Sequence, residues 1–194
     1  MTRDNEAGYT LAEAVVTMVI TAIFMGISTT SIISLYSATN RAQAIADGQA
    51  QIGVAFGRLD RQIRYASGLS TPGLVNGEPY VEYVTTYTGT PICTQLRVRP
   101  STGQLQQRSW TQGTSTVTPT AWTQLAGDVS SPAPFTVSTA TATFTFQRLS
   151  VRLTATTGGA AVAVSRQFGA AFTALNTSLN TQSATVCAEG RAVP

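Results

Sequence analysis

The feature that most constrains this chain is a long apolar segment close to its N-terminus. Residues 14–27 read AVVTMVITAIFMGI, with no charged residue and only two threonines as polar side chains. Apolar character continues more weakly as far as Leu35. A helix from Leu11 to Leu35 rises about 37 Å at ~1.5 Å per residue, which exceeds the ~30 Å hydrocarbon core of a bilayer. The segment is therefore predicted to be a membrane-spanning helix.

A second helical pattern follows without interruption, because no proline occurs before Pro72. Apolar residues recur at alternating four- and three-residue spacing, with Gln49 as the only polar member. The stripe consists of Ile45, Gln49, Ile52, Phe56, Leu59, Ile63 and Ala66. It predicts an amphipathic helical half over residues 36–67 that stops around Ala66–Gly68 and packs on a sheet. A coiled-coil partner is the alternative.

Residues 68–194 read as strands and turns and predict a β-rich head. Expected strands cover Tyr80–Tyr87, Ile92–Arg99, Gln104–Trp110, the alternating residues from Ala142 to Leu153, and Ala161–Phe172. The stretches Thr111–Thr120 and Asp128–Pro134 are expected to be loops. A long N-terminal helix packed on an antiparallel sheet belongs to the α+β class.

The expected strands Ile92–Arg99 and Gln104–Trp110 form a hairpin, because residues 100–103 between them are a turn signal. Arg99 then lies opposite Gln104, and alternation assigns each residue to one of the two faces. Ile92, Leu96, Val98 and Leu105 are predicted to point inward. The predicted outer face carries Cys93, Arg97, Arg99, Arg108 and Trp110. On a strand, Glu78 and Glu82 lie ~13 Å apart, which is too far for them to share a proton or a metal ion. They are therefore interpreted as solvated surface charges.

The composition excludes most catalytic chemistry. Histidine is absent, and all 12 basic residues are arginines. Nucleophiles activated by histidine, lysine-based catalysis and histidine-containing zinc sites therefore cannot form. The nine carboxylates are scattered along the sequence and suggest no acid–base pair. We expect a protein that is not an enzyme and that needs no cofactor or metal.

Glu13 stands at the edge of the apolar segment, where a carboxylate normally needs a partner. Together with the preceding residues it forms the run Gly8-Tyr9-Thr10-Leu11-Ala12-Glu13. This run, followed directly by the apolar helix, resembles the signature of type IV prepilins. In that family a hydrophilic leader ends in glycine, and glutamate is the fifth residue of the mature chain.

The resemblance implies a leader over residues 1–8 and a filament-core helix over residues 9–35. A membrane-embedded aspartyl prepilin peptidase would cut between Gly8 and Tyr9, and the new terminus at Tyr9 would be N-methylated. Glu13 would pair with a terminal amine within a filament. The protein would be a single-pass protein of the cytoplasmic membrane with its head outside, and then part of a pilus or pseudopilus at the cell surface. Its partners would be other pilins.

Further segments are similar to PilW-type minor pilins and to J-type pseudopilins of type II secretion. They are Arg58–Arg64, Leu105–Trp110, Trp122–Asp128 and Phe172–Asn176. This similarity implies a minor subunit of a type IV pilus or of a related secretion or DNA-uptake filament. A major pilin is the alternative within the same class.

The two cysteines, Cys93 and Cys187, are expected to pair, because an exported head lies in an oxidising space. Such a bridge would bring the C-terminal segment across the outer face of the sheet. Two unrelated thiols are the alternative.

The arginines suggest a second function. Beyond Leu35, eleven arginines stand against six carboxylates. Arg97, Arg99 and Arg108, with Trp110, could contact phosphates and stack a base, as in a competence-type minor pilin that binds DNA. The simpler interpretation is a solvated face kept soluble by charge. A membrane-anchored enzyme or solute-binding protein that merely begins like a prepilin is the third class, and it would need a convergent polar pocket.

Overall fold

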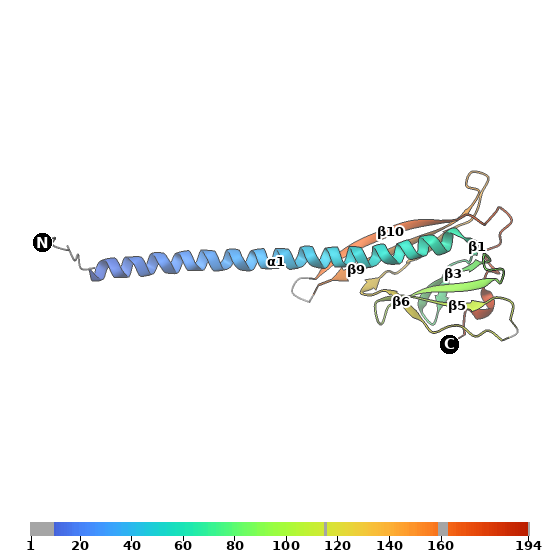
Figure 1. Cartoon of the computed structure of the whole chain (residues 1–194), viewed down its shortest axis with the longest axis horizontal. Coiled ribbons are helices and arrows are strands. Elements are labelled where there is room, and N and C mark those ends of the chain that lie inside the picture. Colours follow the sequence, from blue (N-terminus) through green and yellow to red (C-terminus); the bar gives the residue numbers. More distant parts are fainter. Residues whose placement is uncertain (1–9, 115, 159–162, 194) are drawn as a thin grey trace. The chain divides into compact units, whose positions relative to one another are not determined.

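We describe the protein from a computed structural model, which gives residues 10–114, 116–158 and 163–193. They form two compact units, one ending at Gln43 and the other beginning at Ala44. The first unit holds the N-terminal part of helix α1 (Leu11–Arg64). The second holds the rest of α1 and all the described strands (Figure 1). The fold belongs to the α+β class, as the sequence predicts.

In the apolar part of α1, threonine and serine hydroxyls donate hydrogen bonds to backbone carbonyls of the preceding turn. The Thr17 hydroxyl donates to the Glu13 carbonyl at 2.7 Å, and the Thr21 hydroxyl donates to the Thr17 carbonyl at 2.7 Å. Thr29, Thr30 and Ser31 likewise bond to the carbonyl four positions earlier. These hydroxyls therefore need no water. The helix is long and apolar enough to cross a membrane.

The later part of α1 packs on the strands through one stripe. Ile52, Leu59 and Ile63 are completely or almost completely buried. The Phe56 ring meets Phe172 edge to face, with ring centroids 5.7 Å apart. Burying each such aliphatic side chain contributes about 1.5–3 kcal/mol. The predicted stripe is thus confirmed from Ile52 to Ile63 as the face that docks on a sheet.

The helix ends at Arg64, earlier than the predicted stop at Ala66–Gly68. Strand β1 (Ala66–Leu69) begins almost at once and pairs antiparallel with β3 (Glu78–Thr85). Ala66 is a completely buried strand residue rather than a member of the helical stripe. The predicted helical half 36–67 is therefore too long at its end, because a strand partner distant in sequence satisfies the backbone after Arg64.

The first sheet has six strands in the order β1-β3-β4-β5-β6, and β2 (Gly73–Val75) pairs with β3. Its other members are β4 (Ile92–Arg99), β5 (Gln104–Thr111) and β6 (Thr123–Ala126). Arg99 lies opposite Gln104, as the turn signal predicts. Leu96, Val98 and Leu105 are completely buried on the inner face, against the helix and the second sheet.

The second sheet has four strands in the order β10-β9-β7, and β8 also pairs with β9. These strands are β7 (Val129–Ser130), β8 (Phe135–Ser138), β9 (Gln147–Thr157) and β10 (Val164–Ala174). Leu149, Val151 and Leu153 are buried, and they alternate with the exposed Arg148 and Arg152 as predicted. One hydrophobic core joins both sheets and the later part of α1.

Local expectations differ from the structure at three places. The alternating residues 142–146 form no strand, and Phe144 is half exposed with the Arg148 guanidinium 4.4 Å from its ring centroid. The expected loop Asp128–Pro134 contains β7. The expected strand Ala161–Phe172 corresponds to β10, which begins at Val164, and residues 161–162 lie outside the described residues.

Candidate functional site

The predicted processing site lies just before α1, and its residues Gly8 and Tyr9 are outside the described residues. Thr10 caps the helix. Its hydroxyl accepts from the Glu13 N–H at 3.4 Å, and its carbonyl accepts from the Ala14 N–H at 3.2 Å. Glu13 is therefore the third helical residue, a position where the positive end of the helix dipole favours a carboxylate. The Glu13 residue is exposed in the single chain.

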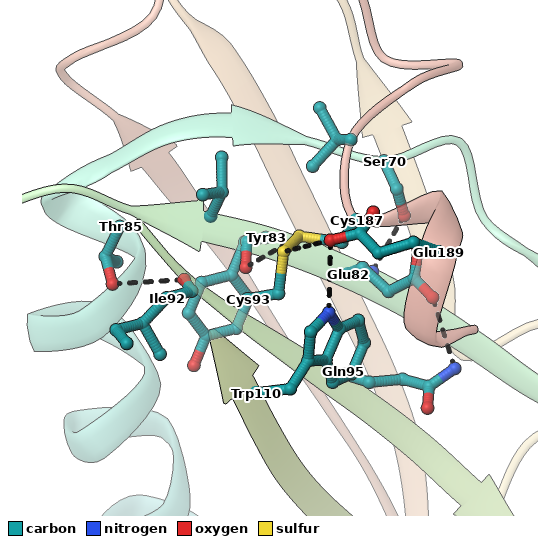
Figure 2. Close-up of a disulfide and its surroundings, with 12 residues drawn as sticks. Ser70, Glu82, Tyr83, Thr85, Ile92, Cys93, Gln95, Trp110, Cys187 and Glu189 are labelled. Carbon is teal, nitrogen blue, oxygen red and sulfur yellow. Dashed lines mark hydrogen bonds between the residues drawn. A yellow bond between two sulfur atoms is a disulfide. The ribbon is translucent and has the colours of Figure 1, made fainter. Parts of the chain in front are cut away.

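The second group of predicted residues lies on the outer face of the first sheet. Cys93 of β4 and Cys187 form a disulfide with Cα atoms 5.7 Å apart (Figure 2). The bridge holds residues 186–193, here named the C-terminal strap, over β3, β4 and β5. Cys93, Cys187 and Trp110 belong to a small second core with Val84 and Val186.

Side chains of the sheet and atoms of the strap bond to one another along this face. The Trp110 indole N–H donates to Glu189 Oε1 at 3.3 Å, and Figure 2 shows the carboxylate above the indole nitrogen. Arg108 Nη2 donates to the Gly190 carbonyl at 3.3 Å. A Cβ atom at Gly190 would overlap the Trp110 ring. The strap therefore sits directly on the aromatic ring and depends on glycine at position 190.

The face assignment and the expected passage of the C-terminal segment across this face are both confirmed. The simpler interpretation of the face as solvated is wrong for Arg108 and Trp110. Arg108 and Trp110 are only 5% and 3% exposed. The strap covers both side chains. Their burial is tolerated because the strap provides the hydrogen-bond acceptors that water would otherwise supply. Arg99 is the exposed member of the group.

Arg97 is held by three different contacts. Its Nη1 donates to Glu78 Oε2 at 2.7 Å, and its Nε donates to Gln106 Oε1 at 2.9 Å. Its guanidinium carbon lies 3.7 Å from the centroid of the Trp122 ring. The Arg108 guanidinium carbon lies 4.5 Å from the same centroid, so one indole supports both cations. Arg99 also pairs with Glu78, at 3.2 Å.

Glu82 is a buried carboxylate, not the solvated charge expected from the sequence. Its side chain is 0% exposed and forms an ion pair with Arg191 of the strap at 2.8 Å. Gln95 Nε2 also donates to Glu82 Oε1 at 3.2 Å. Burial raises the pKa of Glu82 to about 7, although hydrogen bonding and charge from Arg191 act in the opposite direction. Burial likewise lowers the pKa of Arg97 and of Arg108.

The cavity left on this face is small. It has a volume of about 70 Å³ and is bordered by Arg97, Arg108, Trp122 and Arg191. Sites for small molecules usually measure about 300–1,000 Å³. Arg108 therefore binds the strap to the sheet, and the cavity beside it is too small for a nucleotide.

Sequence reasoning missed several members of this network, among them Trp122, Glu189 and Arg191. The register of β3 could have revealed part of it, since Tyr80 lies opposite Arg97 and Glu82 opposite Gln95. Alternation then places Glu78, Tyr80 and Glu82 on the same face as the arginines. No local signal indicated that Arg191 reaches Glu82 across a separation of 109 residues.

The N-terminal segment can be compared with known families. Residues 3–29 match the family model described as the prokaryotic N-terminal methylation motif. This match supports a type IV pilin-like prepilin. The matched segment includes Gly8, Tyr9 and Glu13 and extends into the apolar part of α1. No curated protein and no solved structure matches the chain.

Proposed function

We propose that the chain is a minor pilin or pseudopilin, a structural subunit of a type IV pilus or of a related secretion or DNA-uptake filament. The observation that carries the proposal is the methylation motif over residues 3–29, directly before and within a helix long enough to cross a membrane. The position of Glu13 in the first turn of that helix supports it. The subunit acts by packing against other subunits, not by catalysis.

Processing begins when a prepilin peptidase cuts between Gly8 and Tyr9. The new amine at Tyr9 is methylated and remains a cation. Glu13 then pairs with the terminal amine of a neighbouring subunit when the helices pack together. Such a partner matters because removing one member of a buried ion pair costs about 3–5 kcal/mol.

Before assembly the subunit is stored in the cytoplasmic membrane, with the unit that begins at Ala44 outside. The apolar side chains of α1 support this step, because Val15, Ile20 and Phe24 are exposed in the single chain. Lipid covers these side chains during storage, and the helices of other subunits cover them in the filament.

The buried sheet face favours this role over DNA contact through Arg97, Arg99, Arg108 and Trp110. Arg108 and Trp110 lie beneath the strap, and Arg97 is engaged by Glu78 and Trp122. A phosphate backbone would need accessible cations along a groove. We therefore do not assign nucleic-acid binding to this face.

The intact mass of the protein purified from a cell that has the prepilin peptidase tests the processing step. We expect a chain that begins at Tyr9 and carries one added methyl group. A chain that still begins at Met1 would refute the proposal.

Replacement of Glu13 tests the assembly step. We expect Glu13→Ala to be cleaved normally but to be strongly depleted from sheared filaments, measured by immunoblot of membrane and filament fractions. Asp47→Ala is the matched control, since Asp47 is an exposed carboxylate on the same helix. Normal incorporation of Glu13→Ala would contradict the pairing role.

A further inference from the structure

Two exposed tyrosines form a platform at the end of α1, away from the disulfide face. Tyr65 follows the helix and is 54% exposed, and Tyr87 follows β3 and is 72% exposed. Their ring centroids lie 6.1 Å apart, and the ring planes are inclined by 53°. A cavity of about 320 Å³ is lined by both rings together with Arg61 and Gln62. Large aromatic rings left accessible beside a cavity are typical of binding surfaces.

A second cavity of about 240 Å³ adjoins the first, since Gln62 and Tyr87 line both. We name the two cavities together the tyrosine cleft. The second part is lined mainly by polar groups, among them the hydroxyls of Thr85, Thr88, Thr94 and Ser109. The cleft continues the inner face of the sheet beyond Leu96 and Leu105, where the core ends. Polar residues thus occupy inward positions that apolar residues fill elsewhere on the same strands.

One acceptor in this cleft lacks a protein partner. Gln107 Oε1 is buried and has no hydrogen bond to any residue in the described part of the chain. Gln107 lines the second cavity. Leaving a buried polar atom unpaired costs about 1–3 kcal/mol, so the Gln107 side chain would gain from a donor in the adjoining cavity, either a water molecule or a ligand group.

The cleft is also positively charged. Arg61 lines the first cavity and Arg58 lines the second. The described lining residues include no carboxylate. Neither arginine forms an ion pair with another described residue, whereas nearby Asp60 is engaged by Arg64 at 2.7 Å. An anionic group would therefore find two available guanidinium groups.

We propose that the tyrosine cleft binds an acidic saccharide, with a sugar unit on the tyrosine rings and its carboxylate toward Arg58 and Arg61. The apolar C–H face of a pyranose packs on aromatic rings, and sugar hydroxyls match a wall of hydroxyl and amide groups that both donate and accept. This binding activity goes beyond the proposed role as a filament subunit and does not depend on it.

The geometry favours a saccharide over single-stranded nucleic acid. The two rings are inclined by 53°, so one planar base can stack on only one of them. Two arginines provide few phosphate contacts. For single strands, each phosphate contact lowers the slope of the logarithm of the binding constant against the logarithm of the salt concentration by about 0.7. Two arginines would therefore give a slope of only about −1.4.

Titration calorimetry on the full chain in detergent micelles tests the proposal. The probes are oligogalacturonate, the same oligosaccharide as its neutral methyl ester, and a short oligothymidylate. We expect oligogalacturonate to bind more tightly than either of the others. Tyr87→Ala should weaken its binding about tenfold or more, a loss equivalent to about 1.4 kcal/mol, and Tyr87→Trp should retain it. Arg58→Gln should reduce the preference for the acid over the ester.

The controls separate loss of the site from loss of the fold. Phe144→Ala removes another exposed aromatic ring of the same unit and should leave binding unchanged. The melting temperature of Tyr87→Ala should equal that of the wild type. An affinity that does not change in Tyr87→Ala, or equal binding of acid and ester, overturns the proposal. Tighter binding of oligothymidylate overturns the saccharide assignment. Because binding is measured on the purified chain, the result is independent of cleavage and filament assembly.

Discussion

Replacing Glu82 with glutamine removes a carboxyl group that titrates between the strap and the sheet. In the folded protein, burial raises the pKa of Glu82 from its ordinary value of 4.5 to about 7. The folded state therefore holds the proton more tightly than the unfolded state does. The stability that this group contributes is fully present below about pH 4.5 and is lost as the pH rises through about 7.

The size of the effect follows from the two pKa values. Each pKa unit corresponds to about 1.36 kcal/mol, so the wild-type free energy of unfolding should fall by about 2–3 kcal/mol between pH 5 and pH 8. Glu82→Gln keeps the shape and one acceptor of the side chain but cannot titrate. We expect the variant to show little of this decrease.

Urea unfolding of the full chain in mild detergent, without reductant, measures the effect at both pH values. Trp110 and Trp122 lie at the same face and provide the fluorescence signal. Glu78→Gln is the matched control, because Glu78 lies on the same strand and also pairs with an arginine. It should retain the pH dependence, since Glu82 is still present. An equal decrease in Glu82→Gln, or a wild type that becomes more stable toward pH 8, would refute the reasoning.

Two further variants test the attachment of the strap. Gly190→Ala should destabilise the protein by about 1–3 kcal/mol, because the added methyl group overlaps the Trp110 ring, and chemical unfolding measures this loss. Equal stability of this variant and the wild type would show that the strap can move away from the ring at no cost. The double variant Cys93→Ser, Cys187→Ser should lose about 4–5 kcal/mol, because it reopens a loop with a sequence separation of 94. It should also shift the Trp110 emission toward that of a solvated indole, and an unchanged spectrum would contradict the role of the disulfide in covering this face.

The sequence predicted those parts of the fold that depend on local periodicity. The stripe from Ile52 to Ile63 has helical spacing, and the hairpin of β4 and β5 is defined by alternation and a turn signal. The expected start of the helix at Leu11 also agrees with the structure, where the Thr10 hydroxyl caps the first turn. In these places, neighbours in the chain determine the structure.

The failures occurred where distant segments decide the outcome. Ala66 fits the helical stripe, yet a strand partner at Thr85 takes it into a sheet. Arg108 and Trp110 were assigned to the correct face, and the expected disulfide predicted that the C-terminal segment crosses it, but alternation alone could not show that these two side chains are buried beneath that segment. The contact between Glu82 and Arg191 depends on where the strap lies. The tyrosine cleft likewise combines the end of α1 with residues after β3.

The position of the disulfide has a consequence for the order of folding. Cys187 follows Cys93 by 94 residues, so during synthesis from the N-terminus one thiol is present long before the other. During that interval Trp110 and Arg108 face solvent, and Glu82 has no arginine from the strap. The outer face of the first sheet is therefore the last part of the head to be completed. A truncation or a bulky fusion at the final residues would act on the whole sheet, even though it lies far in sequence from every strand of that sheet.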